Sequence, residues 1–396
     1  MFWRGFVPGV IFLAAACGGS TLNDPSQFDL PTALSVGGSV LASPRVQPIY
    51  FPGFPYGQEI DTFLAHLQTA SYWTTVGAEY GVGALTALPG FAPAMTVPST
   101  MTAADAQSLL GQAIQTMSAM NGGAPIRSDT IYALFFSPDT TLSVQGTTLC
   151  GAGHPSGFHD EWMIGDVKVP VAVIPTCTTS DSDPQLTGVN ILTPALSHEL
   201  IESATDPNVR SAPAFMGIDS KHALWAEALS GAEVGDLCEN EVPSLIQPPD
   251  VGFPVQRIWS NASAHAGTGP CIPVPAGEKY FNAEAALPNQ VKLANGAGGT
   301  VTVPAIDATV GQMISARVSL HGDRSGSSPV SVFAWELDDP NSPLAGHPKS
   351  VTGMVGQTVS VPVTIPAMNK SGVAPLLVGA LSNGALHLWV GGINRR

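Results

Sequence analysis

The residues best suited to chemistry stand together between Ser197 and Pro207, in the sequence S-H-E-L-I-E-S-A-T-D-P. On a helix, His198 and Glu202 would lie one turn apart on the same face, with Glu199 about 100° round from His198. An imidazole and a carboxylate in this arrangement can bind one metal ion, and a second carboxylate beside them can take a proton from water. The stretch therefore predicts two metal ligands, His198 and Glu202, and a general base, Glu199.

Residues on both sides of this stretch predict that it is a short helix. Thr193-Pro194 stands ahead of it in the order of an N-cap followed by a first-turn proline, and Asp206-Pro207 closes it. The pattern H-E-x-x-E resembles the metal-binding helix of zincins, in which H-E-x-x-H is usual. Carboxylate oxygen is an acceptable zinc donor, so zinc is expected. The negative charge that a glutamate adds at the second ligand position leaves calcium or manganese as less favoured metals. The alternative is a surface helix with solvated acidic residues.

A catalytic zinc ion needs a third protein ligand, which commonly comes from beyond the helix. The stretch G-A-E-V-G-D-L-C-E at 231–239 offers Glu233 and Asp236. Asp236 is the first candidate for this ligand and Glu233 is the second.

Together, the two stretches resemble the plant Exordium (phosphate-induced protein) family and its bacterial relatives. The resemblance covers roughly residues 45–275 and extends to further blocks at Tyr132–Asp139, Cys150–His154, Val171–Cys177 and Val255–Asn261. The family usually has C-G-x-H, whereas this chain has one more residue between Gly151 and His154. The resemblance implies an exported protein with a zincin-like helix and leaves the substrate open.

The first residues predict export. Arg4, a short apolar run and three alanines form a signal peptide over residues 1–16, and the run is too short to span a bilayer. Cys17 followed by Gly18 and Gly19 resembles a bacterial lipoprotein cleavage site, so residues 17–44 are expected to be a lipidated tether of low order. The expected location is the bacterial outer membrane or cell surface, or, if Cys17 is not lipidated, the secreted medium.

Cysteine usage agrees with export. With Cys17 assigned to lipid, four of the five cysteines remain, and three connectivities are open to them. Pairing of neighbours in sequence is preferred, which joins Cys150 to Cys177 and Cys238 to Cys271. Metal binding by these cysteines is disfavoured because the chain contains no C-x-x-C spacing.

Charge and length limit the partners and the domains. The formal net charge is −15, which argues against nucleic acid and anionic membrane surfaces, so a membrane would be reached only through the lipid anchor. At 396 residues the chain is long enough for two domains.

The pattern of residues 45–275 predicts an α/β zincin-like domain. Apolar residues at helical spacing occur from Ile60 to Leu67 and from Thr102 to Met117, where Thr102 and Asp105 form a capping box. Buried strands are expected at 45–51, 131–136 and 169–175. This order places a sheet behind the metal-binding helix.

Residues 276–396 predict an all-β, immunoglobulin-like sandwich. Alternating apolar residues occur at 314–320 and 359–365, and Asn383-Gly384 between two apolar runs indicates a hairpin. About seven short strands in such a length are typical of this fold. The domain would serve as a spacer or recognise a polymer or protein.

The other histidines carry weaker signals. His154 could donate a hydrogen bond to a transition state, although a loop histidine near a disulfide is more often structural. His159, His222 and His265 have no partner at metal-ligand spacing, so each is expected to be a surface or hydrogen-bonded residue.

These observations predict an extracytoplasmic zinc-dependent hydrolase, a metallopeptidase with a protein or peptide substrate. The alternative is a non-catalytic cell-surface protein with a structural metal ion, whose sandwich domain binds cell-wall polymer or a partner. A serine hydrolase is disfavoured because the chain has no G-x-S-x-G motif.

Overall fold

The computed structural model describes residues 29–150, 155–180, 183–229, 231–294, 298–322, 328–337, 349–367 and 370–396. The described chain divides into two compact units. The first unit contains residues 35–215 and 245–258, and the second contains residues 29–34, 216–244 and 259–396. The expected domain boundary near residue 275 stays a prediction. The two units are groups of residues in mutual contact, and they divide the chain at other positions. The predicted signal peptide and Cys17 lie outside the described residues.

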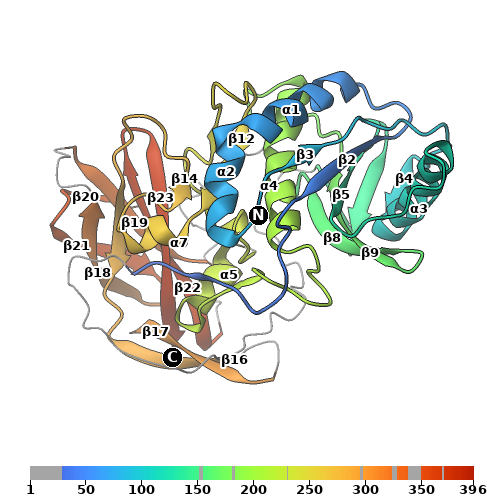
Figure 1. The fold of residues 1–396 in the computed structure, drawn as a ribbon. Coiled ribbons are helices and arrows are strands. Elements are labelled where there is room, and N and C mark those ends of the chain that lie inside the picture. The colour runs from blue at the N-terminus through green and yellow to red at the C-terminus, as the bar shows by residue number, and fades with distance from the viewer. Residues whose placement is uncertain are drawn as a thin grey trace. The chain divides into compact units, whose positions relative to one another are not determined.

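The first unit is built on a five-stranded sheet with the order β3-β2-β5-β9-β8. Neighbouring strands run parallel except β8, which is antiparallel to β9 and forms one edge. The strands are β2 (Arg45–Tyr50), β3 (Thr86–Ala87), β5 (Thr130–Phe135), β8 (Phe158–Ile164) and β9 (Val167–Ile174) (Figure 1). β5 is buried along its whole length, as continuous apolar runs in parallel sheets usually are. The three strands expected in this region are confirmed, and the prediction of an α/β architecture holds for it.

Helices cover both faces of this sheet. Figure 1 shows α3 (Ala103–Met120) on one side, and α1 (Gly57–Thr69), α2 (Ser71–Gly77) and α4 (Leu192–Thr205) on the other. The predicted capping box begins α3, because the Thr102 side chain accepts from the Asp105 N–H and the Asp105 side chain accepts from the Thr102 N–H. Smaller strands complete the unit: β4 (Thr100–Thr102), β6 (Thr141–Val144), β7 (Thr147–Thr148), β11 (Leu245–Ile246) and β12 (Val255–Gln256).

The expectation of low order up to residue 44 is wrong for residues 29–44. In the first unit, Leu41 is buried and its N–H donates to the carbonyl of Ala204 at 2.9 Å. In the second unit, β1 (Ala33–Leu34) pairs with β10 (Gly217–Ile218) in an antiparallel ladder. A few apolar side chains and backbone hydrogen bonds are enough to hold this polar stretch in place.

The second unit is mostly antiparallel β structure. One sheet has the order β15-β18-β21 and the other has the order β16-β17-β23-β22-β19-β20, with β17 and β23 as the parallel pair. The strands are β15 (Phe281–Ala285), β16 (Asn289–Ala294), β17 (Thr300–Ala308), β18 (Met313–Gly322), β19 (Val330–Glu336), β20 (Val351–Gly353), β21 (Thr358–Thr364), β22 (Gly372–Ser382) and β23 (Ala385–Arg395). The hairpin predicted at Asn383-Gly384 is confirmed, and both turn residues have positive φ, at 50° and 83°.

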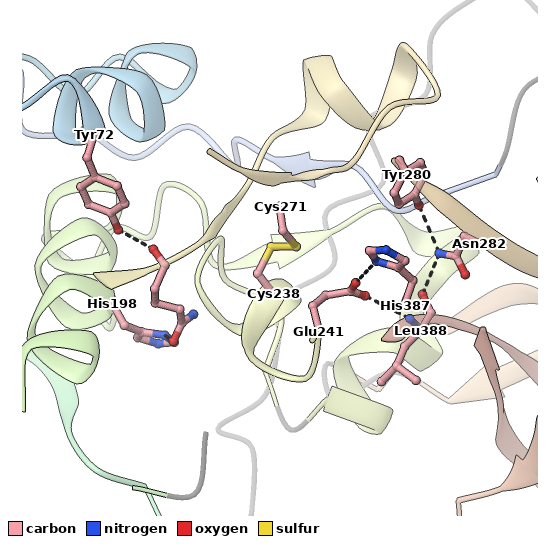
Figure 2. The surroundings of a disulfide bond; sticks show 10 residues. Tyr72, His198, Cys238, Glu241, Cys271, Tyr280, Asn282, His387 and Leu388 are labelled. Atoms are coloured by element: carbon pink, nitrogen blue, oxygen red, sulfur yellow. Dashed lines mark hydrogen bonds and ion pairs between the residues drawn. A yellow bond between two sulfur atoms is a disulfide. The ribbon is translucent and has the colours of Figure 1, made fainter. Parts of the chain in front are cut away.

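Short elements join the segment 216–244 to these sheets within the second unit. They are α5 (Ala223–Leu229), α6 (Asp236–Glu239), α7 (Asn261–His265), β13 (Ile258–Trp259) and β14 (Cys271–Ile272). Figure 2 shows Glu241 bound to the β23 strand: its Oε2 lies 2.5 Å from Nδ1 of His387, and its Oε1 accepts from the N–H of Leu388 at 3.0 Å. All of these groups are buried, so the contacts fix the segment firmly to the sheet.

Both predicted disulfides are confirmed. Cys150 pairs with Cys177 in the first unit, and Cys238 pairs with Cys271 in the second (Figure 2). Disulfides are typical of proteins outside the cytoplasm. Among the described residues, none of the helices has the length and apolar character needed to cross a membrane.

Candidate metal centre

The helix that carries the motif is longer at its start than the sequence predicts. A 3₁₀ turn at Gly188–Ile191 leads directly into α4, so Thr193 lies buried inside the helix and the predicted N-cap is wrong. The predicted end is confirmed, since the N–H of Asp206 donates to the carbonyl of Glu202 and the helix stops at Thr205. Asp206 then holds the chain that follows, because its Oδ1 accepts from the N–H of Ala214 at 2.8 Å.

Two serines anchor α4 to the strands around it. Ser203 Oγ lies 3.4 Å from the carbonyl of Val171 in β9, and Ser197 Oγ accepts from the N–H of Gln256 in β12 at 3.0 Å. Every residue of α4 except Ala195 is buried. The helix is therefore a central element of its unit, and the reading of the motif as a solvated surface helix is wrong.

His198 and Glu202 meet on this helix as predicted. His198 Nε2 lies 3.0 Å from Glu202 Oε2. The other ring nitrogen of His198, Nδ1, lies 3.0 Å from the amide oxygen of Gln256, which can accept a proton from it. That hydrogen bond selects the tautomer in which Nε2 carries a lone pair facing Glu202, the form that binds a metal.

Glu199 lies next to this pair on α4, against the loop before β8. A Cβ added to Gly157 would come within 3.1 Å of both Glu199 Oε1 and the side chain of Ile174, so the loop before β8 packs directly against the Glu199 carboxylate. A side chain at position 157 would therefore push on the Glu199 carboxylate and on Ile174, which would each have to move by a few tenths of an ångström.

His159 also belongs to this cluster, so of the two expectations for it, a surface residue or a hydrogen-bonded one, the second is confirmed. Its Nδ1 lies 3.3 Å from Glu202 Oε2 and 3.4 Å from Glu199 Oε2. The side chains are all inaccessible, with exposed fractions of 7% for His159, 11% for His198, 8% for Glu199 and 3% for Glu202. Two imidazoles and two carboxylates thus converge within the first unit.

The pleat of β8 explains why His159 faces α4. Trp162 and Ile164 pack into the core shared with α3, and side chains alternate along a strand, so His159 points to the opposite face. A bidentate pair between Asp160 and Arg210, at 2.5 Å for both contacts, ties β8 to the loop that follows α4. The alternation in F-H-D-E-W-M-I followed by the turn Gly165-Asp166 is a strand signal that sequence reasoning missed.

The electrostatics favour a cation at this cluster. Burial alone would raise the pKa of Glu202, but the imidazoles of His198 and His159 outweigh it and hold the pKa well below its usual range. Glu202 is therefore a carboxylate at neutral pH, surrounded by nitrogen donors. His198 and Glu202 bring an imidazole nitrogen and a carboxylate oxygen within 3.0 Å of each other, and imidazole and carboxylate are donors that zinc accepts.

The two acids predicted as third ligands belong to the second unit. There Asp236 Oδ2 accepts from the N–H of Glu233 at 3.1 Å, and the part of either acid in the metal site stays a prediction. His154 lies outside the described residues.

No protein-family model matches the chain, and no curated protein matches it. The resemblance to the Exordium family stays a prediction that rests on the sequence blocks that carry it.

Proposed function

We propose that the protein is an extracytoplasmic zinc-dependent hydrolase, acting on peptide bonds. The observation that carries the proposal is the buried contact of 3.0 Å between His198 Nε2 and Glu202 Oε2 on α4, with Glu199 on the same helix. A donor pair this close, backed by Gln256, fits a metal ion better than it fits an isolated ion pair on a surface. The disulfides support a place outside the cytoplasm, and Cys17 would supply a lipid anchor.

In this mechanism His198 and Glu202 hold the metal, with Asp236 or Glu233 as the third ligand predicted from the sequence. The ion would supply Lewis acidity, which polarises the substrate carbonyl and acidifies water. Glu199 takes a proton from the attacking water, holds it on a carboxylate oxygen and returns it to the leaving amine. Gly157 packs against the Glu199 carboxylate and limits its movement during both transfers.

The finer fold assignments form part of the same proposal. The first unit would be zincin-like, with the mostly parallel sheet behind α4. The two sheets of the second unit would form an immunoglobulin-like sandwich that binds cell-wall polymer or acts as a spacer.

A second function, a non-catalytic surface protein with a structural ion, is favoured by one observation. Every side chain of the cluster is nearly inaccessible, whereas a catalytic metal ion needs an open coordination position for water and substrate. The two functions differ in whether the bound ion exchanges its water for a substrate analogue.

The test uses protein beginning after Cys17, purified without chelators, and its Glu199→Ala variant. We expect about one zinc per chain in both proteins, and cleavage of a peptide library by the unchanged protein alone. Glu59→Ala is the matched control, since Glu59 is an exposed glutamate of the first unit, on α1. Equal peptide cleavage by Glu199→Ala would refute the mechanism, and zinc without any cleavage would favour the structural ion.

A further inference from the structure

We infer that the edge strand β8 positions the general base, and that His159 does so by donating a hydrogen bond from its Nδ1 to Glu199. In this role His159 is a positioning residue that acts through Glu199 and is not a metal ligand. The inference rests on the proposed function, because it concerns the base of the same site. Both β8 and α4 belong to the first unit, so the whole arrangement lies within that unit.

The partners of His159 Nδ1 show that this atom carries a proton. It lies 3.4 Å from Glu199 Oε2 and 3.3 Å from Glu202 Oε2. Glu202 is ionised, and an ionised carboxylate can only accept hydrogen bonds, so the ring nitrogen next to it has to be a donor. The proton on Nδ1 therefore lies near two buried carboxylates that would repel each other without it.

Each oxygen of the Glu199 carboxylate meets a different residue from β8 or from the loop before it. Oε2 accepts from His159, and Oε1 lies against Gly157, where a Cβ would come within 3.1 Å of it. Contacts at both oxygens restrict the rotation of the carboxylate. A general base has to face the water and then the leaving amine, so this restriction serves both proton transfers.

The strand that carries His159 is itself fixed to the chain that follows α4. The bidentate pair between Asp160 and Arg210 is one connection. Glu161 provides a second, since its Oε2 accepts from the N–H and the hydroxyl of Ser211 at 3.2 Å and 2.9 Å. These bonds hold β8 against the helix, and a positioning residue needs such a rigid support.

The first measurement needs no enzymatic activity. It is ¹⁵N NMR of metal-free protein labelled at its histidines, in which the chemical shift of a ring nitrogen shows whether it carries a proton. We expect a proton on Nδ1 of His159, and a changed Nδ1 shift in Glu199→Ala. The signal is identified by its loss in His159→Asn, and Glu59→Ala, which changes an exposed glutamate of α1, should leave it unaltered. A bare Nδ1, or a shift that Glu199→Ala leaves unaltered, would overturn the inference.

The second measurement is peptide cleavage at saturating zinc, so that metal affinity does not enter. We expect His159→Leu to lower kcat by about 10–100-fold, because misplacement of a catalytic group by 1 Å can cost about 100-fold. The KM for the peptide should change by less than about threefold, because His159 does not touch the substrate. His159→Asn should recover most of the lost kcat, since its amide nitrogen can take the place of Nδ1 and donate. The matched control is His66→Ala, which changes an exposed histidine of the same unit.

The double variant Glu199→Ala/His159→Leu separates a role through Glu199 from a general loss of structure. Once the base is gone a positioning residue has nothing to hold, so the double variant should cleave at the residual rate of Glu199→Ala. A further fall of about tenfold or more in the double variant would overturn the inference.

The outcomes distinguish the two proposals. Unchanged kcat in His159→Leu, together with loss of cleavage in Glu199→Ala, would overturn the role of His159 and leave the proposed function standing. A proton on Nδ1 that responds to Glu199→Ala, in a protein that cleaves no peptide, would overturn the proposed function while the hydrogen bond stands.

Discussion

Replacement of Gln256 by leucine tests whether the helix histidine is held in its metal-binding form. The Gln256 amide oxygen lies 3.0 Å from His198 Nδ1, and leucine has a similar size but no acceptor. The backbone of Gln256 keeps its own bonds, since its carbonyl accepts from the hydroxyl of Tyr72 at 2.6 Å and its N–H donates to Ser197 Oγ at 3.0 Å. The substitution therefore removes the orientation of one ring and leaves the strand in place.

The size of the effect follows from the role of this bond. A hydrogen-bond partner of a metal-binding histidine contributes about 10–100-fold to metal affinity, which is about 1.4–2.7 kcal/mol. Because Gln256 and His198 are both buried, water cannot easily replace the lost acceptor, and we expect the upper half of this range. Gln256→Glu should act in the opposite direction, because a carboxylate is a stronger acceptor for the Nδ1 proton.

The assay is zinc titration of metal-free protein against a chelator of known affinity, with the midpoint of urea unfolding measured beside it. Gln247→Leu is the matched control, because Gln247 is exposed and bonds only the carbonyl of Gly252 among the described residues at 3.0 Å. Zinc affinity within threefold of the unchanged protein in Gln256→Leu would refute the reasoning, since the tautomer would then not depend on Gln256.

Two further predictions concern the stability of the second unit. His222 lies between the carboxylates of Asp219 and Asp29. Burial alone would lower the pKa of His222, but these carboxylates raise it from 6.5 to about 9. The charged imidazole therefore stabilises the fold fully below pH 6.5, and this stabilisation is lost as the pH rises to 9. The free energy of unfolding, measured in urea, should fall by up to about 3 kcal/mol between pH 6.5 and pH 9. In His222→Gln the contribution of this histidine to the fall should be absent. A His222→Gln variant with the same pH profile as the unchanged protein would contradict the charge assigned to His222. Glu241→Ala leaves His387 and the N–H of Leu388 buried without their acceptor, and should lower the free energy of unfolding by about 3–5 kcal/mol in urea titrations. A loss below 1 kcal/mol would show that the pair contributes little.

The sequence predicted those parts of the fold whose information is local. The capping box at Thr102, the apolar run of β5 and the turn at Asn383-Gly384 each depend on neighbours in the chain, and each is confirmed. The predicted start of α4 is wrong because Thr193-Pro194 has the sequence of an N-cap and a first-turn proline. In the structure the 3₁₀ turn Gly188–Ile191 runs directly into the helix, which begins at Leu192, and the short motif does not reveal this.

The candidate site divides in the same way. His198, Glu199 and Glu202 could be found from sequence because one helix fixes their relation at intervals of one and four residues. His159 could not be found by ligand spacing, because it stands 39 positions before His198 and belongs to a strand of the sheet. The alternation that predicts β8 also predicts that His159 lies on the polar side of that strand. The sequence does not say that this side packs against α4. The helix motif alone therefore describes only part of this buried cluster, because an imidazole from the neighbouring strand also lies 3.3 Å from the Glu202 carboxylate.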